Sequence, residues 1–383
     1  MTRPPVNDRG FGVYVHWPFC ARICPYCDFN VVRDRGRTAE KTDLVQAILA
    51  DLAAHAALIG PRRLASIFFG GGTPSLMEPA WVAAIVERAT ALWPIAADLE
   101  VTLEANPTDA ERRRFEAFRS AGVNRLSLGV QSLDGDALTA LGRNHDAVAA
   151  RRGSETARQV FDRLSVDLIY ARPGQTLAAW TAELHAVVAL GPEHVSPYQL
   201  TIETGTAFDR AVRRGSLHMP PADLSADFYE ATQTVLSAAG FEAYEVSNPA
   251  RGAAARSRHN LIYWRGGDYV GVGPGAHGRL TVDGIRRATA APNRVADYVA
   301  RVRESGAASL GESMAPRDAA LERLLMGLRT VEGVALDDLL ALDIPGPRIA
   351  DLAGLVEAAQ GRLIATARGR PVLDRVIATL AGA

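Results

Sequence analysis

Short apolar runs alternate along the chain with longer segments in which apolar residues recur at helical spacing. The apolar runs are rich in β-branched residues, as buried strands are, and they occupy residues 12–17, 65–70, 98–105, 125–132, 164–170 and 194–201. The helical segments between and around them cover residues 40–58, 79–92, 109–121, 134–163 and 177–189. This alternation predicts an α/β fold with a parallel sheet and helices outside it.

Periodicity alone leaves two arrangements of these six strands open, a doubly wound open sheet and a partly closed barrel. The polar residues favour the barrel, because the loops at the carboxyl ends of barrel strands all face one mouth. A cysteine-bearing loop follows the first strand and Gly70–Thr73 follows the second, while Glu104, Gln131 and Asp167 lie in or at the end of the next three. We therefore expect a partial parallel (β/α)6 barrel whose mouth collects these residues.

The pattern changes after the sixth strand. A helical pattern at 222–239 and an apolar run at 241–248 precede residues 251–278, which are rich in Gly and polar residues and which we interpret as a functional loop region rather than regular structure. Further on, helices are predicted at 316–331, 335–342 and 347–359, and a hairpin that turns near Gly369. We divide the chain into a barrel core (1–220), an extension that completes the barrel (221–309) and a small winged-helix-like α+β domain (310–383).

Composition narrows the class of protein. Lys and Arg total 42 against 43 Asp and Glu, so no global positive field favours nucleic acid, and we expect no nucleic-acid partner. The mixed charges of the C-terminal domain indicate a packing or docking role rather than DNA reading. The N-terminal residues contain no apolar targeting core, and no later run is expected to cross a bilayer, which predicts a cytoplasmic protein without a transmembrane segment.

All three cysteines of the 383-residue chain lie within eight positions, at Cys20, Cys24 and Cys27. An odd set in one loop is no disulfide framework, and ordinary buried cysteines would be scattered. Structural zinc needs four ligands, and His16, which could be proposed as the fourth, lies on an apolar strand and is more typical of the core. The spacing favours a [4Fe-4S] cluster, in which three cysteine ligands leave one iron open to a small molecule.

The motif Cys20-x3-Cys24-x2-Cys27, with Tyr26 before the third cysteine, resembles the radical S-adenosylmethionine (SAM) superfamily. The resemblance implies that SAM chelates the open iron and is cleaved by an electron from the cluster, in a cavity poor in water. The glycines after the second strand would let the backbone approach the methionine end of SAM. The SAM contacts that the resemblance implies are Tyr14, Tyr26, Gly71, Gly72, Thr73, Glu104, Gln131, Arg143 and Asp167.

The resemblance extends over nearly the whole chain and is closest to the oxygen-independent coproporphyrinogen III oxidase group. The segments VYVHWPFC, LGVQS, LGRNHD and VDLIYARPGQT follow the order of that group, although Arg172 stands where a small or apolar residue is usual. In the C-terminal third, the segments HNLIYW and YVGVGPGAHG are similar to the HemW branch, whose members are haem chaperones. The chain is thus identified as a member of this group with features of its chaperone branch.

Two features favour a chaperone over an oxidase. Phe29 stands where the oxidase has a fourth cysteine, and only about a dozen residues precede the first strand, whereas the oxidase has a longer arm. The resemblance thus implies a haem chaperone that delivers haem to apo-haemoproteins. The alternative is decarboxylation of coproporphyrinogen III to protoporphyrinogen IX, which the missing cysteine argues against. A third reading, an RNA-modifying radical SAM enzyme, lacks a basic stripe or an RNA-binding domain.

Haem iron needs an axial donor, and His259 is the first candidate because Tyr263 and Trp264 beside it could stack on a macrocycle. In the alternative reading, His259 and Asn260 pin a loop by hydrogen bonds. His277 is a second candidate.

The implied cofactors are a [4Fe-4S] cluster and SAM, with haem as cargo. The implied partners are haem or a porphyrin, apo-haemoproteins and an electron donor. A monomer or a homodimer, peripheral contact with a membrane, and SAM as reagent or as bound ligand are all compatible with the sequence.

Overall fold

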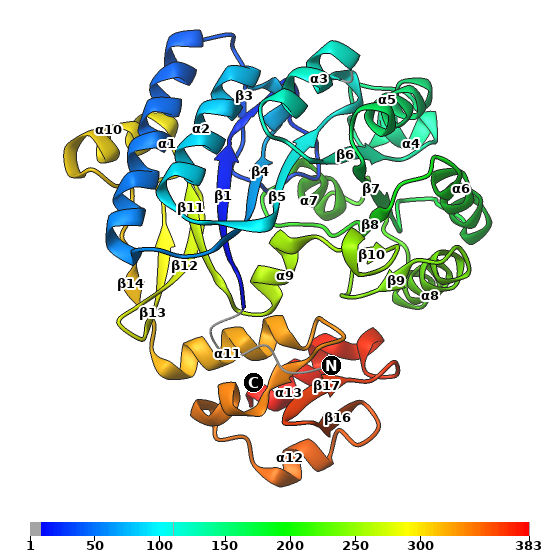
Figure 1. Cartoon of the computed structure of the whole chain (residues 1–383). Coiled ribbons are helices and arrows are strands. Elements are labelled where there is room, and N and C mark those ends of the chain that lie inside the picture. Colours follow the sequence, from blue (N-terminus) through cyan, green and yellow to red (C-terminus); the bar gives the residue numbers. More distant parts are fainter. Residues whose placement is uncertain (1–8, 110, 383) are drawn as a thin grey trace.

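Parallel strands form the centre of a large sheet that curves into an open, partial barrel (Figure 1). The computed structural model of the chain describes residues 9–109 and 111–382. The six predicted strands are all present and pair in sequence order. They are β1 (Phe11–Trp17), β4 (Leu64–Gly71), β5 (Ile95–Ala105), β6 (Arg125–Gln131), β7 (Arg163–Tyr170) and β8 (His194–Gln199).

Additional strands extend this sheet at both edges. The full order is β14-β13-β12-β11-β1-β4-β5-β6-β7-β8-β10-β9, and no pairing joins the two edge strands within the described residues, so the barrel stays open. The prediction of a partial parallel barrel is confirmed. The added strands are β9 (Glu242–Ala243), β10 (Pro249–Ala250), β11 (Asp268–Val272), β12 (His277–Val282), β13 (Ile285–Ala290) and β14 (Glu312–Ser313).

Helices cover the outer face of the sheet (Figure 1). The strands are buried on both faces, and in β1 the side chains of Val13, Val15 and Trp17 have no exposed area. Such burial explains why the strands appear in the sequence as continuous apolar runs. The helices are α1 (Thr38–Ile59), α2 (Pro79–Leu92), α3 (Arg112–Ser120), α4 (Gly135–Ala140), α5 (Ala147–Val160), α6 (Leu177–Ala189), α7 (Ala207–Arg213), α8 (Ala222–Ala238), α9 (Arg258–Trp264) and α10 (Val295–Ser305).

The longest helix, α1, is apolar and long enough to span a membrane by length and composition. The expectation that no segment meets this test was therefore wrong. The helix nevertheless packs against α2, α10 and β11, and its fully buried Asp51 accepts hydrogen bonds from Tyr298 Oη at 2.8 Å and from the Ala308 backbone N–H at 3.0 Å. These contacts are those of a core helix.

The predicted helix 134–163 is wrong in its middle, where a turn divides it into α4 and α5. Gly142 has a φ of +67°, which favours glycine, and a Cβ there would lie 2.6 Å from Pro25 Cδ in the cysteine loop. The side chain of Asp146 then caps α5 by accepting from the Ala149 N–H at 2.8 Å. The turn carries Arg143 toward the cysteines.

The interpretation of residues 251–278 as irregular structure was also wrong in part, because they contain α9 and β11. β11 pairs parallel with β1, with Phe11 opposite Asp268. The glycines here serve close packing, since a Cβ on Gly271 would lie 2.0 Å from His277 O and one on Gly273 would lie 2.2 Å from His16 O.

A second hydrophobic core, from Ala320 to Leu380, lies in the C-terminal α+β domain. Two predictions failed there. The helix expected at 347–359 ends at Ala350, and the hairpin turns at Gln360 and Gly361 rather than near Gly369. Both turn residues have positive φ, 53° and 73°, as a two-residue hairpin turn requires. The elements are α11 (Pro316–Gly327), a 3-10 helix (Leu336–Leu342), α12 (Gly346–Ala350), α13 (Leu373–Ala381), β15 (Val334–Ala335), β16 (Val356–Ala359) and β17 (Arg362–Ala365).

Candidate functional site

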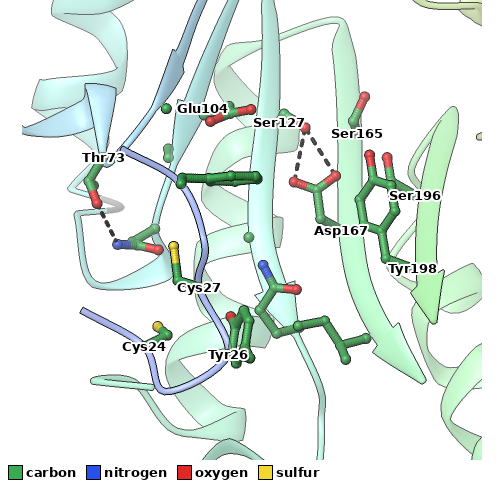
Figure 2. Close-up of a pocket in the computed structure, with 18 of the residues that line it drawn as sticks. Cys24, Tyr26, Cys27, Thr73, Glu104, Ser127, Ser165, Asp167, Ser196 and Tyr198 are labelled. Atoms are coloured by element: carbon green, nitrogen blue, oxygen red, sulfur yellow. Dashed lines mark hydrogen bonds between the residues drawn. The ribbon is translucent and has the colours of Figure 1, made fainter. Parts of the chain in front are cut away.

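A cavity of about 370 Å3 opens at the carboxyl ends of the parallel strands. Figure 2 shows its two walls, with Cys24, Tyr26 and Cys27 on one side and Glu104, Ser127 and Asp167 on the other. The first wall is the cysteine loop, residues 21–31, which joins β2 (Phe19–Cys20) to β3 (Val32–Arg33). The second is built by the ends of β4 to β8. The barrel mouth therefore brings together residues that are far apart in the sequence.

The cysteine loop is held at both ends. β2 and β3 pair parallel, so that Cys20 lies opposite Arg33. Asn30 fixes the end of the loop, because its Nδ2 donates to the backbone carbonyls of Pro274 and Asn293, both at 2.8 Å. His16 Nε2 lies 2.9 Å from Asn30 O and His16 Nδ1 lies 3.0 Å from Tyr14 Oη. With both ring nitrogens engaged, His16 is not a fourth metal ligand.

The three thiols are free and line the cavity. Burial raises the pKa of Cys20, and raises that of Cys27 to about 11. Thr73 Oγ1 donates to Cys20 Sγ at 3.5 Å and Arg143 Nη1 donates to Cys24 Sγ at 3.5 Å. Among the described residues, no three His, Cys, Asp or Glu side chains converge on a point that could hold one metal ion.

The glycines after β4 are required by the packing of the chain itself. Gly71 has a φ of +103°, and a Cβ on Gly72 would lie 2.8 Å from the backbone oxygens of Trp17 and Phe19. The next residue, Thr73, donates its N–H to Phe19 O at 2.9 Å. These contacts fix the end of β4 against the start of the cysteine loop. The predicted approach of the glycine backbone to SAM stays a prediction.

Two carboxyl groups with altered acidity lie in the cavity. Burial, reinforced by the nearby charge of Asp167, raises the pKa of Glu104 to about 8. Burial also raises the pKa of Asp167 to about 6, although hydrogen bonds from Ser196 and Ser127 oppose the rise. Ser127 Oγ donates to both Asp167 oxygens at 3.1 Å. A cationic or hydroxyl-bearing ligand would relieve the cost of ionising this pair.

The acidity of Glu104 predicts a pH dependence of stability in protein freed of cluster and SAM. Because its folded pKa of about 8 exceeds its ordinary value of 4.5, the stability that the neutral carboxyl contributes is complete below pH 4.5 and is lost as pH rises through 8. Glu104→Gln should flatten this part of the curve of unfolding free energy against pH. Glu203→Gln, at the exposed edge of the cavity, should not, and equal curves for both variants would refute the shift.

Arg143 and Gln131 also line the cavity. Arg143 Nη2 donates to Gly129 O at 3.0 Å and also bonds Asn106 Oδ1. Asn106 Nδ2 in turn lies 3.4 Å from Thr73 Oγ1, so that this amide links two predicted SAM residues. Gln131 ends β6 with a φ of +64°, beside a shift in the pairing with β7. Backbone strain of this kind is concentrated at functional sites.

The structure brings together eight of the nine predicted SAM residues, all except Tyr14, which is absent from the cavity wall. The Tyr14 ring stacks on Phe68 and on His259 behind the wall. Asn30 and Asn106 were missed by the sequence analysis. Their positions, just after Cys27 and just after a strand end, were the signal that could have found them.

His259 does not face the cavity. Its Nδ1 lies 3.0 Å from Ser66 Oγ, its Nε2 lies 2.7 Å from Tyr263 Oη, and its ring stacks on Phe68 with centroids 4.6 Å apart. Burial lowers its pKa to about 3. Both nitrogens are occupied, which favours the reading of His259 as a residue that pins a segment over that of a haem ligand. His277 is exposed at the start of β12 and also lies outside the cavity wall.

The floor of the cavity was not predicted. Inward-facing polar residues alternate along β6, β7 and β8, such as His194, Ser196 and Tyr198 on β8, and this period of two was the signal in the sequence. Four buried polar atoms on the cavity wall lack a hydrogen-bond partner within the described chain, Thr102 Oγ1, Arg143 Nε, His194 Nδ1 and Asn248 Oδ1. The interior of the cavity is therefore suited to polar ligands or water.

Comparison with known proteins identifies the family to which the chain belongs. The model of the radical SAM superfamily matches residues 14–185. The heme chaperone HemW of Mycobacterium tuberculosis strain CDC 1551 is 36% identical over 99% of this chain and 96% of its own length. The chain belongs to the HemW family of radical SAM proteins. Membership confirms the predicted resemblance, and the radical SAM family implies SAM and a [4Fe-4S] cluster.

Two further proteins are similar to this chain. The mitochondrial radical S-adenosyl methionine domain-containing protein 1 of Bos taurus is 44% identical over 73% of this chain, and the match spans 63% of that relative's length. The coproporphyrinogen III oxidase HemN from Escherichia coli has a TM-score of 0.80 with 23% identity, and the match covers 98% of this chain and 91% of HemN. The likeness to HemN shows the fold alone.

Proposed function

We propose that this protein is a haem chaperone that binds haem and transfers it to apo-haemoproteins. The observation that carries the proposal is the similarity to the heme chaperone HemW of M. tuberculosis, which extends over 99% of the chain. The cytoplasmic location, contact with a membrane surface and the oligomeric state stay predictions.

The residues of the site fit the cofactors of the family. Cys20, Cys24 and Cys27 would hold the [4Fe-4S] cluster, and the polar wall that includes Glu104 and Asp167 would hold SAM. When bound, the pair would supply one-electron chemistry at the SAM sulfonium. Thr73 and Arg143 donate toward two of the three sulfurs, and such donors favour the thiolate, which is the form of cysteine that binds a metal.

Phe29 separates this proposal from the oxidase alternative. It lines the cavity, and its side chain is 63% exposed. The oxidase group has a fourth cysteine at this position. The aromatic ring of Phe29 supplies no thiol in its place. The position instead adds an apolar surface at the cavity mouth.

The proposal is tested with the whole chain, reconstituted with iron and sulfide and kept free of oxygen. Haem is titrated in and followed by its Soret absorbance, and the loaded protein is mixed with a haem-depleted acceptor. Saturable binding and recovery of the holo-acceptor are expected. Parallel incubation with coproporphyrinogen III, SAM and reductant should give no vinyl product, and vinyl product without haem transfer would favour the oxidase.

A further inference from the structure

We propose that Arg172 and Glu183 are positioning residues for SAM, because their buried ion pair fixes the turn that holds Gln131 at the cavity wall. The inference rests on the SAM site of the proposed function. It gives a role to Arg172, which stands where a small or apolar residue is usual. Neither member of the pair lines the cavity, so both would act through the turn.

Two neighbouring strands of the barrel end in strained backbone. Gln131, the last residue of β6, has a φ of +64°, and Ala171, which follows β7, has a φ of +55°. The left-handed region is unfavourable for a residue with a Cβ, and such a conformation persists only where surrounding contacts hold it. The paired ends of β6 and β7 therefore both need contacts that hold them.

The residue after each strained position is tied to the same glutamate. Ser132 Oγ donates to Glu183 Oε1, and the Leu133 backbone N–H donates to the same oxygen at 2.6 Å. Arg172 Nη2 donates to the other oxygen, Oε2, at 2.7 Å. One carboxylate on α6 thus joins the end of β6 to the end of β7.

This link is buried, because Ser132, Arg172 and Glu183 all lie in the interior. An arginine at this place has a cost, since its Nη1 lacks a hydrogen-bond partner among the described residues. An apolar residue would avoid that cost but would leave Glu183 as an unpaired buried charge. Arg172 therefore acts as the counter-charge of the carboxylate that accepts hydrogen bonds from the turn.

The held turn continues into the rest of the predicted SAM wall. Ser132 Oγ also accepts from the Asp134 backbone N–H at 3.0 Å, and the side chain of Asp134 caps the start of α4. After α4 comes the turn that carries Arg143 to the cysteine loop. Gln131 and Arg143 thus lie at the two ends of a segment whose first turn is fixed from outside the cavity.

The test compares the wild type with Arg172→Met in the full chain, reconstituted with iron and sulfide and kept free of oxygen. Equilibrium dialysis with radiolabelled SAM should show a Kd raised by about tenfold in the variant. The matched control is Arg112→Met, which breaks an exposed pair with Glu116 and should keep the Kd within about twofold of wild type. Equal Kd values for the two variants would overturn the proposal.

A double variant separates positioning from stability. Arg172→Met combined with Glu183→Leu removes both charges, and replacing a buried ion pair by apolar residues of similar volume is often neutral for stability. Urea unfolding should therefore give a midpoint near that of wild type. The Kd for SAM should stay raised by about tenfold, because Ser132 and Leu133 have lost their acceptor. Recovery of SAM binding together with stability would assign the pair a structural role alone and overturn the positioning role.

Two more measurements ask whether the pair acts through the turn. Gln131→Ala should itself weaken SAM binding, and adding Arg172→Met should then raise the Kd by less than about threefold, because the positioned side chain is already gone. Fully additive losses would contradict the proposal. Hydrogen exchange of the Leu133 amide should be about tenfold faster in the double variant than in wild type, and an unchanged rate would contradict it as well.

These outcomes are distinguishable from failure of the proposed function. A wild type that binds no SAM overturns the SAM site and the positioning role together. A wild type that binds SAM, with the expected losses in the variants, but transfers no haem supports the positioning role and overturns the haem chaperone alone.

Discussion

Replacing Cys24 by Ser is expected to abolish the brown absorbance of the iron-sulfur cluster together with SAM cleavage. The chain has three cysteines, all within eight positions, so no other thiol can replace the one that is lost. A serine hydroxyl is a poor ligand for iron that prefers sulfur. The measurements are iron and sulfide content, the visible absorbance of the cluster, and release of 5′-deoxyadenosine from SAM in oxygen-free solution.

The matched control is Asp28→Asn, a change in the same loop at an exposed residue that is not a cluster ligand. It should keep cluster and cleavage near the wild-type level. Far-ultraviolet circular dichroism should be the same for both variants, because the loop contributes little to either hydrophobic core. Retention of a full cluster by Cys24→Ser would overturn the assignment of the three thiols, since it would require ligands from elsewhere.

The central sheet could be predicted from the sequence because its strands are buried on both faces. A run such as that of β1, in which Val13, Val15 and Trp17 have no exposed area, allows little besides apolar residues, and the signal is therefore strong. Residues 251–278 were predicted wrongly because two of their glycines serve close packing rather than break regular structure. Gly271 and Gly273 lie where a strand packs against backbone at distances that admit no Cβ, and composition alone reads such glycines as a loop.

The residues of the candidate site that could be predicted are those that lie in one motif or at strand ends. The cysteines and eight of the nine residues predicted to contact SAM line one cavity, because carboxyl ends of parallel strands face one mouth. Tyr14 was assigned to SAM by resemblance and His259 to haem because of the aromatics beside it, and in the structure both lie in the aromatic packing behind the cavity wall. The contact between His259 and Ser66 depends on α9 and β4 coming together, which no local pattern shows.

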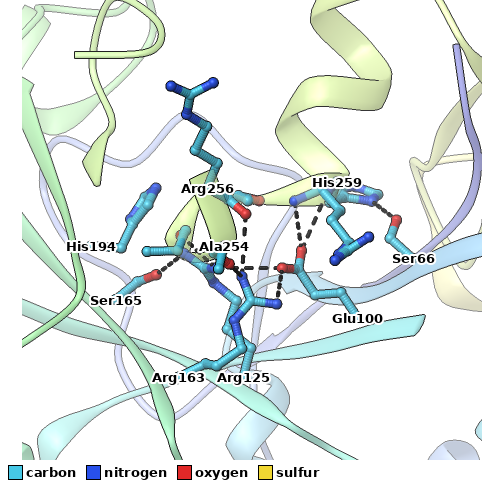
Figure 3. A network of polar contacts seen from close by, with 12 residues as sticks. Ser66, Glu100, Arg125, Arg163, Ser165, His194, Ala254, Arg256 and His259 are labelled. Carbon is cyan, nitrogen blue, oxygen red and sulfur yellow. Dashed lines mark hydrogen bonds and ion pairs between the residues drawn. The ribbon is translucent and has the colours of Figure 1, made fainter. Parts of the chain in front are cut away.

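The floor of the barrel holds a buried network of charges that sequence patterns also do not show (Figure 3). Glu100 has no exposed area, and its Oε2 lies 2.9 Å from Arg163 Nη1 and 3.4 Å from Arg125 Nη1. Its Oε1 accepts from the backbone N–H of Arg258 at 2.9 Å, at the start of α9. The Glu100 carboxylate thus contacts two arginines, which share Glu193 as their second acidic partner, and it holds the helix that closes the bottom of the barrel.

Replacing Glu100 by Gln should therefore lower the free energy of unfolding by about 3–5 kcal/mol, the range for removing one partner of a buried ion pair. The amide keeps the shape of the side chain but leaves the buried Arg125 without its neutralising charge. Glu116→Gln, which removes the partner of Arg112 in an exposed pair, is the matched control and should cost at most about 1 kcal/mol. Urea unfolding measures both. A loss for Glu100→Gln as small as that of the control would mean that Glu193, whose Oε1 lies 3.8 Å from Arg125 Nη1, suffices to balance the buried arginine.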